Sequence, residues 1–280
     1  MTYQTLVDVD TLATHLENPD WVIVDCRFSL ADTSAGQRAY EAAHIPGAVY
    51  AHLDHDLSGP PVTDAGRHPL PTPAALTDLF GRLGIDAQKQ VVAYDDAGGM
   101  IASRLWWMLH YMGHENTAVL DGGWPTWQTQ NLPVRSGNEQ NSPTLFIGEP
   151  NRSWLVQLAD VPQQPLLVDS RGRDRYRGEN ETIDPRAGHI PHAHSLPFAE
   201  RLTPDGHMLP VATLQAQFAD LLQDTPAAQA TFYCGSGVSA CVNLLALRHA
   251  GLGMARLYVG SWSEWSQDPQ RTAVVGDTPI

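Results

Sequence analysis

Short apolar runs alternate with amphipathic stretches along the whole chain, and this pattern predicts strands that alternate with helices. Small-residue turns follow two of the runs, and each turn leads into a stretch with helical spacing, at 103–112 and 239–251. We therefore expect an α/β fold with mainly parallel sheets and helices on both faces. The runs that resemble buried strands are VIVD (22–25), VVAY (91–94), LLVD (166–169) and ATFY (230–233), while AVLDGG (118–123) and RLYVGS (256–261) resemble edge or final strands.

The same blocks occur twice in the same order, which predicts two homologous domains. VIVDCR at 22–27 returns as LLVDSR at 166–171, and AHIPGA at 43–48 returns as GHIPHA at 188–193. VVAYD and GGWPTW return in the same way as ATFYC and GSWSEW. We therefore expect an N-terminal domain over residues 1–135 and a C-terminal domain over residues 151–280. The segment 136–150 is rich in Asn, Pro, Gly and Ser and is expected to be a linker.

Charge and composition narrow the classes of partner. In 280 residues, 31 acidic and 17 basic side chains give a net charge of −14 with histidine neutral. An acidic chain without a basic run is a poor binder of nucleic acid or of an anionic membrane, so we expect neither as a partner. An anionic ligand must then be held locally, by a few arginines and by backbone N–H groups. The content of 42% hydrophobic residues is enough for a folded core.

Hydropathy and cysteine usage suggest a cellular location. No apolar stretch approaches the roughly 18 residues of a membrane-spanning helix, and the first residues, MTYQTLVDVD, do not resemble a secretion signal. The three cysteines, Cys26, Cys234 and Cys241, are an odd number and form no CxxC pair. These features predict a cytoplasmic protein with reduced thiols.

The strongest chemical signal is a cysteine in YCGSGVSACVNLLALRH (233–249), between a predicted buried strand and a predicted helix. Ligands of doubly wound folds bind where strands end and loops lead into helices. The N–H groups of the turn GSGVSA and the start of the helix favour an anion, and hence a thiolate, at Cys234. A thiolate is a nucleophile, so we predict that Cys234 is catalytic. A buried structural cysteine is the alternative, and it is the preferred interpretation for Cys26 and Cys241.

Three other interpretations of this turn fit the residues less well. Gly235, Gly237 and Ala240 match the dinucleotide-binding pattern, but residues 248–263 contain no acidic residue to hold a ribose. A cysteine phosphatase needs an arginine at the position that Ala240 occupies. A cysteine–histidine pair of the papain type stays open among 12 histidines, although no nearby residue supports it.

The repeat provides an internal comparison for this turn. The equivalent turn in the first half is YDDAGGMIASR (94–104), and Asp95 stands there in the place of Cys234. The fold therefore does not require a cysteine at this turn, and we expect the N-terminal domain to be non-catalytic.

With these motifs the chain resembles the tandem-domain rhodanese-like sulfurtransferases, a family that includes thiosulfate and 3-mercaptopyruvate sulfurtransferases. The resemblance covers essentially the whole chain, through VDCR, HIPGA and DGGW in the first half and VDSR, RYRGE, GHIP, CGSGV and GSWSEW in the second. It implies two rhodanese domains, of which only the second is catalytic, and no cofactor or metal. It also implies that the thiolate takes sulfur from a donor, becomes a persulfide and passes that sulfur to an acceptor.

Within this family, CGSGV resembles the 3-mercaptopyruvate type, because thiosulfate enzymes of the mammalian type carry a cation where Ser236 stands. The resemblance implies a triad-like relay of Ser236 with two residues of the first domain, His68 in GRHPLP and Asp54 in YAHLDHDLS. Ser239 takes the place of that type's threonine. A turn cap for Asp54 and an exposed loop position for His68 are the alternatives.

The resemblance also implies which groups bind the substrate. Arg175 in RYRG matches the family's substrate arginine, and Arg186 is the nearest candidate for a second one. Arginine suits a carboxylate because its planar guanidinium donates two parallel hydrogen bonds. Arg171 is expected to form a structural ion pair instead. The turn residues expected to line the anion site are Gly235, Gly237, Val238 and Ser239.

We therefore expect a monomeric sulfurtransferase that moves sulfane sulfur from 3-mercaptopyruvate to a thiol, such as thioredoxin or a small thiol, or to cyanide. A thiosulfate:cyanide sulfurtransferase and a non-catalytic persulfide carrier are the alternatives. The three histidines of HIPHAH (189–194) raise the question of a metal site, but their spacing is not that of regular ligands. A surface turn is the preferred interpretation of that segment.

Overall fold

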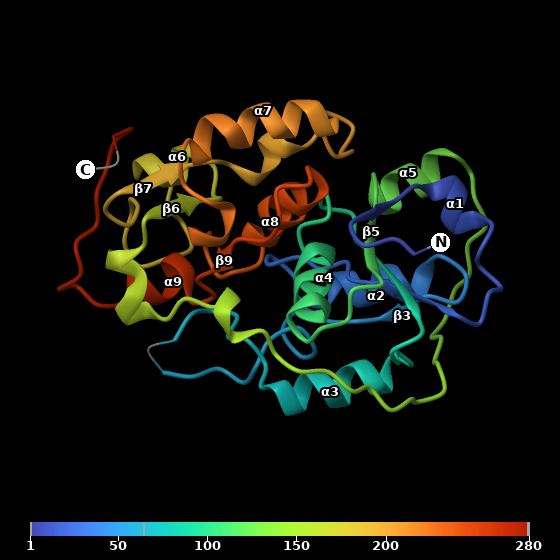
Figure 1. Ribbon diagram of the computed structural model, residues 1–280. Coiled ribbons are helices and arrows are strands. Elements are labelled where there is room, and N and C mark those ends of the chain that lie inside the picture. Colours follow the sequence, from blue (N-terminus) through green and yellow to red (C-terminus); the bar gives the residue numbers. More distant parts are fainter. Residues whose placement is uncertain (1, 64, 279–280) are drawn as a thin grey trace. The chain divides into compact units, whose positions relative to one another are not determined.

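A computed structural model describes residues 2–63 and 65–278, and its strands form two sheets, one from each half of the chain (Figure 1). The first sheet has five strands in the order β1-β5-β4-β2-β3, and its strand pairs are parallel. The elements of this half are β1 (Leu6–Val7), α1 (Val9–Ala13), β2 (Trp21–Asp25), α2 (Ala35–Ala42), β3 (Val49–Tyr50), α3 (Pro73–Arg82), β4 (Gln90–Tyr94), α4 (Ala102–Tyr111), β5 (Thr117–Leu120) and α5 (Gly123–Thr129).

The second sheet has four strands in the order β7-β6-β8-β9, and these strands also pair in parallel. The expected α/β class with mainly parallel sheets is therefore confirmed in both halves. The elements of this half are the 3₁₀ helices η1 (Arg152–Trp154), η2 (Leu158–Gln163), η3 (Phe198–Arg201) and η4 (Ala227–Gln229), the strands β6 (Leu166–Asp169), β7 (Ala193–Ser195), β8 (Ala230–Tyr233) and β9 (Arg256–Leu257), and the helices α6 (Arg173–Arg177), α7 (Val211–Leu222), α8 (Ala240–His249) and α9 (Ser261–Trp265).

Helices cover both faces of the first sheet. On one face, Ile23 of β2 and Val92 of β4 pack with Leu12 of α1 and Trp127 of α5 in one buried cluster. Side chains alternate along a strand, so the neighbouring Val91 and its equivalents point to the other face, where α4 contacts β4 and β5. A parallel sheet that is buried on both faces needs apolar residues at successive positions, which explains the unbroken run VVAY.

The second sheet is buried in the same way. Leu167 of β6 and Tyr233 of β8 belong to a buried cluster with Tyr176 of α6 and Trp262 of α9. Helix α8 contacts β8 and α7, and most of its side chains are buried. Full burial of each large apolar side chain contributes roughly 1.5–3 kcal/mol, so these clusters are the main source of stability in each half. They also fix the strand ends from which the loops of the site leave.

The chain packs into two compact units. Unit 1 consists of the residues up to Gly59, Pro71–Asn151 and Pro204–Met208, and unit 2 consists of Pro60–Leu70, Arg152–Thr203 and the residues from Leu209 onward. Two short segments thus differ from the expected domains, whose boundary lies between residues 135 and 151. Residues 60–70 pack with unit 2, and residues 204–208 pack with unit 1. Residues 65–67 contact α9 and the chain after it, because the Arg67 N–H donates to Ser263 Oγ and the Gln267 side chain donates to the Ala65 carbonyl.

The segment 136–150, expected as a linker, contains no helix or strand at any of its residues, all of which are described. It packs along α3 in unit 1, where the Thr144 N–H donates to the Gly81 carbonyl and Phe146 is buried. Across residues 2–63 and 65–278, none of the helices is both long and apolar enough to cross a membrane.

A buried carboxylate–guanidinium pair lies at the end of an interior strand of each sheet, β2 in unit 1 and β6 in unit 2. In unit 1, Arg27 Nη2 lies 2.6 Å from Asp25 Oδ2 and also donates to the Ala43 carbonyl at 2.7 Å. In unit 2, Arg171 Nη2 lies 2.6 Å from Asp169 Oδ2 and donates to the Gly188 carbonyl at 2.7 Å. The repeated D-x-R motif thus ties the strand to the turn that contains HIP. The expectation that Arg171 forms a structural ion pair is confirmed.

Replacing Asp25 by asparagine should lower the free energy of unfolding by about 3–5 kcal/mol, because it leaves the buried Arg27 without a counter-charge. Urea unfolding followed by tryptophan fluorescence measures this loss. Asp32→Asn is the matched control, since the Arg38–Asp32 pair is 60% and 53% exposed, and exposed pairs contribute about 0–1 kcal/mol. Equal losses in the two variants would contradict the structural role of the buried pair.

Candidate active site

Cys234 lies immediately after β8, in the turn that leads into α8, and its side chain is buried. Its backbone is held from α9: the Cys234 N–H donates to Ser261 Oγ at 3.2 Å, and its carbonyl accepts from the Trp262 N–H at 3.0 Å. Ser261 has a left-handed φ of +55°, which is an uncommon conformation for a residue with a side chain. The start of α9 therefore positions the backbone of Cys234.

The turn after Cys234 requires glycine at position 237. Gly237 has a φ of +71°, and a Cβ there would lie 2.5 Å from the Val259 carbonyl oxygen. Only glycine combines that backbone conformation with that close approach. The turn is therefore packed directly onto the chain before α9.

The N–H groups of this turn have the arrangement of an anion site. Within the described residues, the backbone N–H groups of residues 235, 236, 238, 239 and 240 have no hydrogen-bond acceptor. Unit 1 shows what the equivalent turn does with an anion. There the Asp95 carboxylate accepts hydrogen bonds from the N–H groups of Ala97, Gly99, Ile101 and Ala102, at 2.7–2.9 Å. The turn after β4 is thus able to surround a negative charge with N–H groups.

The Asp95 carboxylate occupies the centre of this turn in unit 1, where it accepts hydrogen bonds from the backbone N–H groups. Burial raises the pKa of Asp95, although the four N–H hydrogen bonds oppose that rise. The turn that holds a thiol in unit 2 is therefore already filled by the chain's own acidic side chain in unit 1.

His68 and Ser236 come together beside Cys234 within unit 2. His68 Nδ1 and Ser236 Oγ share a hydrogen bond of 2.7 Å, and both side chains are buried. An exposed loop position for His68 is therefore wrong. The histidine reaches the serine because the segment 60–70 packs with unit 2, although it lies in the first half of the sequence.

Arg175 lies next to the same turn. Its Nη2 lies 2.8 Å from Glu181 Oε2 and 3.0 Å from Asp184 Oδ2. A Cβ at Gly235 would lie 3.5 Å from Arg175 Nη1, so this guanidinium stands next to the residue that follows Cys234. Arg67 stands there too, with Nη2 3.3 Å from the same Cβ position and Nη1 2.5 Å from Asp184 Oδ1.

Charges of opposite sign alternate from the core to this turn. Arg171 Nη1 lies 3.4 Å from Glu181 Oε2, so the buried Asp169–Arg171 pair continues through Glu181 to Arg175, Asp184 and Arg67. Burial alone would raise the pKa of Glu181, but hydrogen bonds from the N–H groups of Asp184 and Ile183 and from Arg175 lower it overall. Glu181 therefore stays ionised and keeps Arg175 in place.

Three other positions that the sequence singled out have local contacts of their own. Arg186 donates to the carbonyls of Asp268 and Arg271, both at 2.7 Å, so its guanidinium holds the chain after α9. Asp54 belongs to unit 1, where its N–H donates to His52 Nδ1 at 3.0 Å. His192 occupies a turn at a left-handed φ of +63°, where the first repeat has Gly47 at +80°. Within the described residues, no group of three or more His, Cys, Asp or Glu is arranged to hold a metal ion.

The other two cysteines are in different surroundings from Cys234. Cys26 follows β2 and is fully buried, and burial raises the pKa of its thiol well above the usual value. Cys241 is buried in α8, and its Sγ donates to the Gly237 carbonyl at 3.5 Å. A neutral buried thiol is a poor nucleophile, which fits the structural interpretation of both.

Sequence reasoning missed Arg67, Asp184 and Ser261. Arg67 stands directly before His68, so the GRHPLP segment was a signal that pointed to both residues. Asp184 and Glu181 lie between the two arginines that the sequence did single out, and their acidic character gave no hint of an anion site. Ser261 takes the place of Gly123 in the repeat, a difference that was visible in the paired motifs GGWPTW and GSWSEW.

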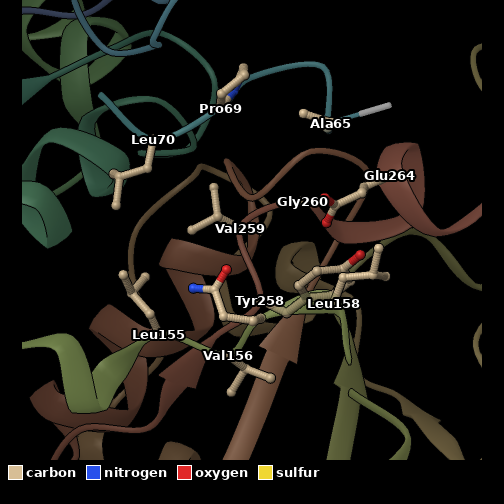
Figure 2. A pocket seen from close by; sticks show the side chains of 12 residues that line it. Ala65, Pro69, Leu70, Leu155, Val156, Leu158, Tyr258, Val259, Gly260 and Glu264 are labelled. Carbon is tan, nitrogen blue, oxygen red and sulfur yellow. The ribbon is translucent and has the colours of Figure 1, made fainter. Parts of the chain in front are cut away.

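A pocket of about 190 Å³ borders the segment 65–70 on residues next to Arg67 and His68. Figure 2 shows apolar side chains such as Leu70, Leu155 and Val259 around it, with the Glu264 carboxylate near Gly260. Cys234, Ser236 and Arg175 are not among its lining residues. The pocket is therefore a neighbour of the turn that holds Cys234. Its lining residues are Ala65, Gly66, Pro69, Leu70, Leu155, Val156, Gln157, Leu158, Tyr258, Val259, Gly260 and Glu264.

Comparison with known proteins defines the class of this fold and site. Residues 8–130 and 151–268 each match the model of the rhodanese-like domain, so the chain is a tandem arrangement of two such domains. The chain belongs to the rhodanese-like family. The resemblance that the motifs indicated is thereby confirmed.

Relatives that align along almost the whole chain are sulfurtransferases. The chain is 43% identical over 284 residues to a probable 3-mercaptopyruvate sulfurtransferase of Pseudomonas aeruginosa, covering 99% of this chain and 100% of that protein. It is 32% identical over 277 residues to the thiosulfate sulfurtransferase of Rattus norvegicus, covering 94% and 92%. The structure of the 3-mercaptopyruvate sulfurtransferase from Leishmania major matches with a TM-score of 0.84 and 30% identity, over 94% of this chain and 74% of that one. The protein is thus a sulfurtransferase, as the motifs predicted.

Proposed function

We propose that this sulfurtransferase takes sulfur from 3-mercaptopyruvate through a persulfide on Cys234 and passes it to a thiol, such as thioredoxin or a small thiol, or to cyanide. The hydrogen bond between Ser236 and His68, 2.7 Å long beside the turn of Cys234, is the observation that carries the choice of donor. It provides a hydroxyl and an imidazole that can move a proton, at a position where a dianionic donor would need a cation.

The first half-reaction transfers one sulfur atom and one proton. The Cys234 thiolate attacks the thiol sulfur of the donor, so that an S–S bond forms while the C–S bond breaks. The electron pair of the C–S bond leaves on the enolate of pyruvate, which takes up the proton of the donor thiol at its methyl carbon. Ser236, with His68, is placed in this proposal to carry that proton.

The second half-reaction restores the enzyme. An acceptor thiolate or cyanide attacks the outer sulfur of the persulfide, and the Cys234 thiolate leaves. The N–H groups of residues 235–240 support both states, because each carries a negative charge on sulfur within reach of the turn. Covalent catalysis of this kind divides one difficult transfer into two easier ones.

The remaining roles and the setting are also part of this proposal. Arg175 binds the donor carboxylate, and Gly235, Gly237, Val238 and Ser239 shape the anion site. Asp54 stays a prediction from the family resemblance, as does Arg186, and a monomer is the expected state. The three cysteines are all free thiols, which supports a reducing compartment such as the cytoplasm.

Cys234→Ser should abolish sulfur transfer and the gain of one sulfur atom in mass after incubation with donor, because the hydroxyl cannot form a persulfide. Steady-state assays with cyanide and intact-protein mass spectrometry measure the two effects. Cys26→Ser and Cys241→Ser are the matched controls and should stay active. Wild-type activity in Cys234→Ser would show that another group is the nucleophile, and a wild type that gains sulfur but never turns over would indicate a carrier.

Ser236→Ala should lower kcat for 3-mercaptopyruvate by about 10²–10⁴-fold, the range of a lost proton transfer, or by less if water replaces the hydroxyl. Ser236→Lys should raise thiosulfate activity relative to 3-mercaptopyruvate activity, because a cation beside Cys234 favours a dianion. The ratio of kcat/KM for the two donors measures both effects. A wild type that prefers thiosulfate, together with unchanged 3-mercaptopyruvate kinetics in Ser236→Ala, would reverse the choice of donor.

Arg175→Ala should lower kcat/KM for 3-mercaptopyruvate by about 10- to 150-fold, because a charge-assisted pair to a bound anion is lost. Arg186→Ala should do less, since its guanidinium is occupied by the carbonyls of Asp268 and Arg271. Initial rates over a range of donor concentrations separate the effects on KM and kcat. Unchanged kinetics in Arg175→Ala would remove this residue from the donor site.

A further inference from the structure

The small pocket of unit 2 that borders the segment 65–70 depends on how this segment packs. The segment meets the start of α9 through two glycines, because a Cβ at Gly66 would lie 2.5 Å from the Gly260 carbonyl oxygen. The Arg67 N–H also donates to Ser263 Oγ at 3.0 Å. The pocket therefore has its full wall only while the segment stays packed on α9.

Two polar groups in the wall of this pocket lack partners. The Tyr258 side chain is 1% exposed, and its hydroxyl has no hydrogen-bond partner within the described residues. The Glu264 carboxylate lies so close to Gly260 that a Cβ at that glycine would overlap it. Across residues 2–63 and 65–278, no arginine, lysine or histidine forms an ion pair with this carboxylate. Burial, and after it the charge of Glu264, raise the pKa of Tyr258, so the hydroxyl keeps its proton.

The rest of the lining is mainly apolar, apart from the Gln157 side chain. Figure 2 shows Leu70 and Leu155 on one side of the pocket, with the Tyr258 hydroxyl and the Glu264 carboxylate on the other. The pocket has a volume of about 190 Å³. An apolar cavity of about 150 Å³ takes up benzene, so this pocket has room for one ring with a short polar arm.

We propose that this pocket binds a small organic ammonium ion, whose apolar body lies against the leucines and whose N–H groups donate to Glu264 and Tyr258. An ammonium group supplies both the positive charge and the donors that the carboxylate lacks. The hydroxyl oxygen of Tyr258 accepts from such a group and keeps its own proton for the carboxylate. The inference does not depend on the sulfur donor, because Cys234, Ser236 and Arg175 do not line the pocket.

A ligand in this pocket acts on the active site without touching Cys234. The segment 65–70 contains His68, which shares a hydrogen bond of 2.7 Å with Ser236. A ligand that binds only the packed segment stabilises that arrangement by mass action. Occupation of the pocket thereby restrains the histidine beside the catalytic turn.

Benzylamine, which is protonated at neutral pH, is the probe, and benzyl alcohol is its uncharged counterpart of similar size. Isothermal titration calorimetry should give a Kd for benzylamine on the order of 1 mM or below. Glu264→Gln should weaken benzylamine about tenfold, the loss of one charge-assisted contact, and should change the affinity for benzyl alcohol less than about twofold. No binding of benzylamine, or equal affinities of wild type for the two compounds, would overturn the proposal.

Two further variants separate this pocket from other carboxylates and from an effect on folding. Asp160 lines a second hollow that shares Leu155 and Val156 with this pocket, so Asp160→Asn is the matched control and should leave benzylamine affinity unchanged. Tyr258→Phe should weaken benzylamine severalfold without lowering the free energy of unfolding, because it removes a buried hydroxyl that has no partner. Equal weakening by Asp160→Asn and Glu264→Gln would show that the amine binds acidic groups without selection.

Hydrogen exchange measured by mass spectrometry locates the ligand. At a benzylamine concentration of ten times Kd, exchange in peptides that cover residues 65–70 should slow about tenfold, because the ligand reduces opening of the segment by the factor 1 + [L]/Kd. Exchange in α7 should stay unchanged, since that helix does not line the pocket. Binding of benzylamine without slower exchange in residues 65–70 would place the ligand elsewhere and overturn the proposal.

Discussion

The buried carboxylate–guanidinium pair at the end of β2 or β6 is the interaction on which the rest of each unit depends. In unit 1, Asp25 accepts from Arg27 and from the Tyr94 hydroxyl, and the Arg27 guanidinium lies 4.4 Å from the centre of the Trp124 ring. In unit 2, Arg171 holds Asp169 and lies 4.8 Å from the Trp262 ring. A charge pair in this setting is stable only when nearly every donor and acceptor has a partner, which fixes the strand, the HIP turn and the last helix together.

Unit 2 extends this pair into its active site, and unit 1 does not. Glu181 accepts from both Arg171 and Arg175, so the buried pair determines where the Arg175 guanidinium stands. Asp184 pairs with both Arg175 and Arg67, so the network of ion pairs continues to Arg67. The same network that stabilises the fold thereby positions the guanidinium groups of Arg175 and Arg67 beside Gly235.

The two units also show how one turn serves two purposes. In unit 1 the turn closes on the Asp95 carboxylate with four N–H hydrogen bonds, and the anion is part of the chain. In unit 2 the shorter side chain of Cys234 stands at the start of the turn, and Ser261 rather than the turn itself holds its backbone N–H. Within the described residues, the N–H groups of residues 235, 236, 238, 239 and 240 have no acceptor. Of the two equivalent turns, the one in unit 1 is therefore the one that an acidic side chain of the protein itself fills.

The sequence by itself determined the parallel sheets and the duplicated order of elements, and it singled out Cys234 as the candidate nucleophile, because these follow from local patterns. Apolar runs of four residues need a sheet that is buried on both faces, and a cysteine between a strand and a glycine turn has a recognisable setting. The sequence also suggested Ser236, His68 and Arg175.

Only the tertiary structure decided that the segment 60–70 packs with unit 2, which brings His68 to Ser236 and Arg67 to Gly235. It likewise decided that Arg186 holds two carbonyls after α9. Contacts between residues more than 80 positions apart depend on packing and charge pairing in three dimensions, and no local pattern encodes them.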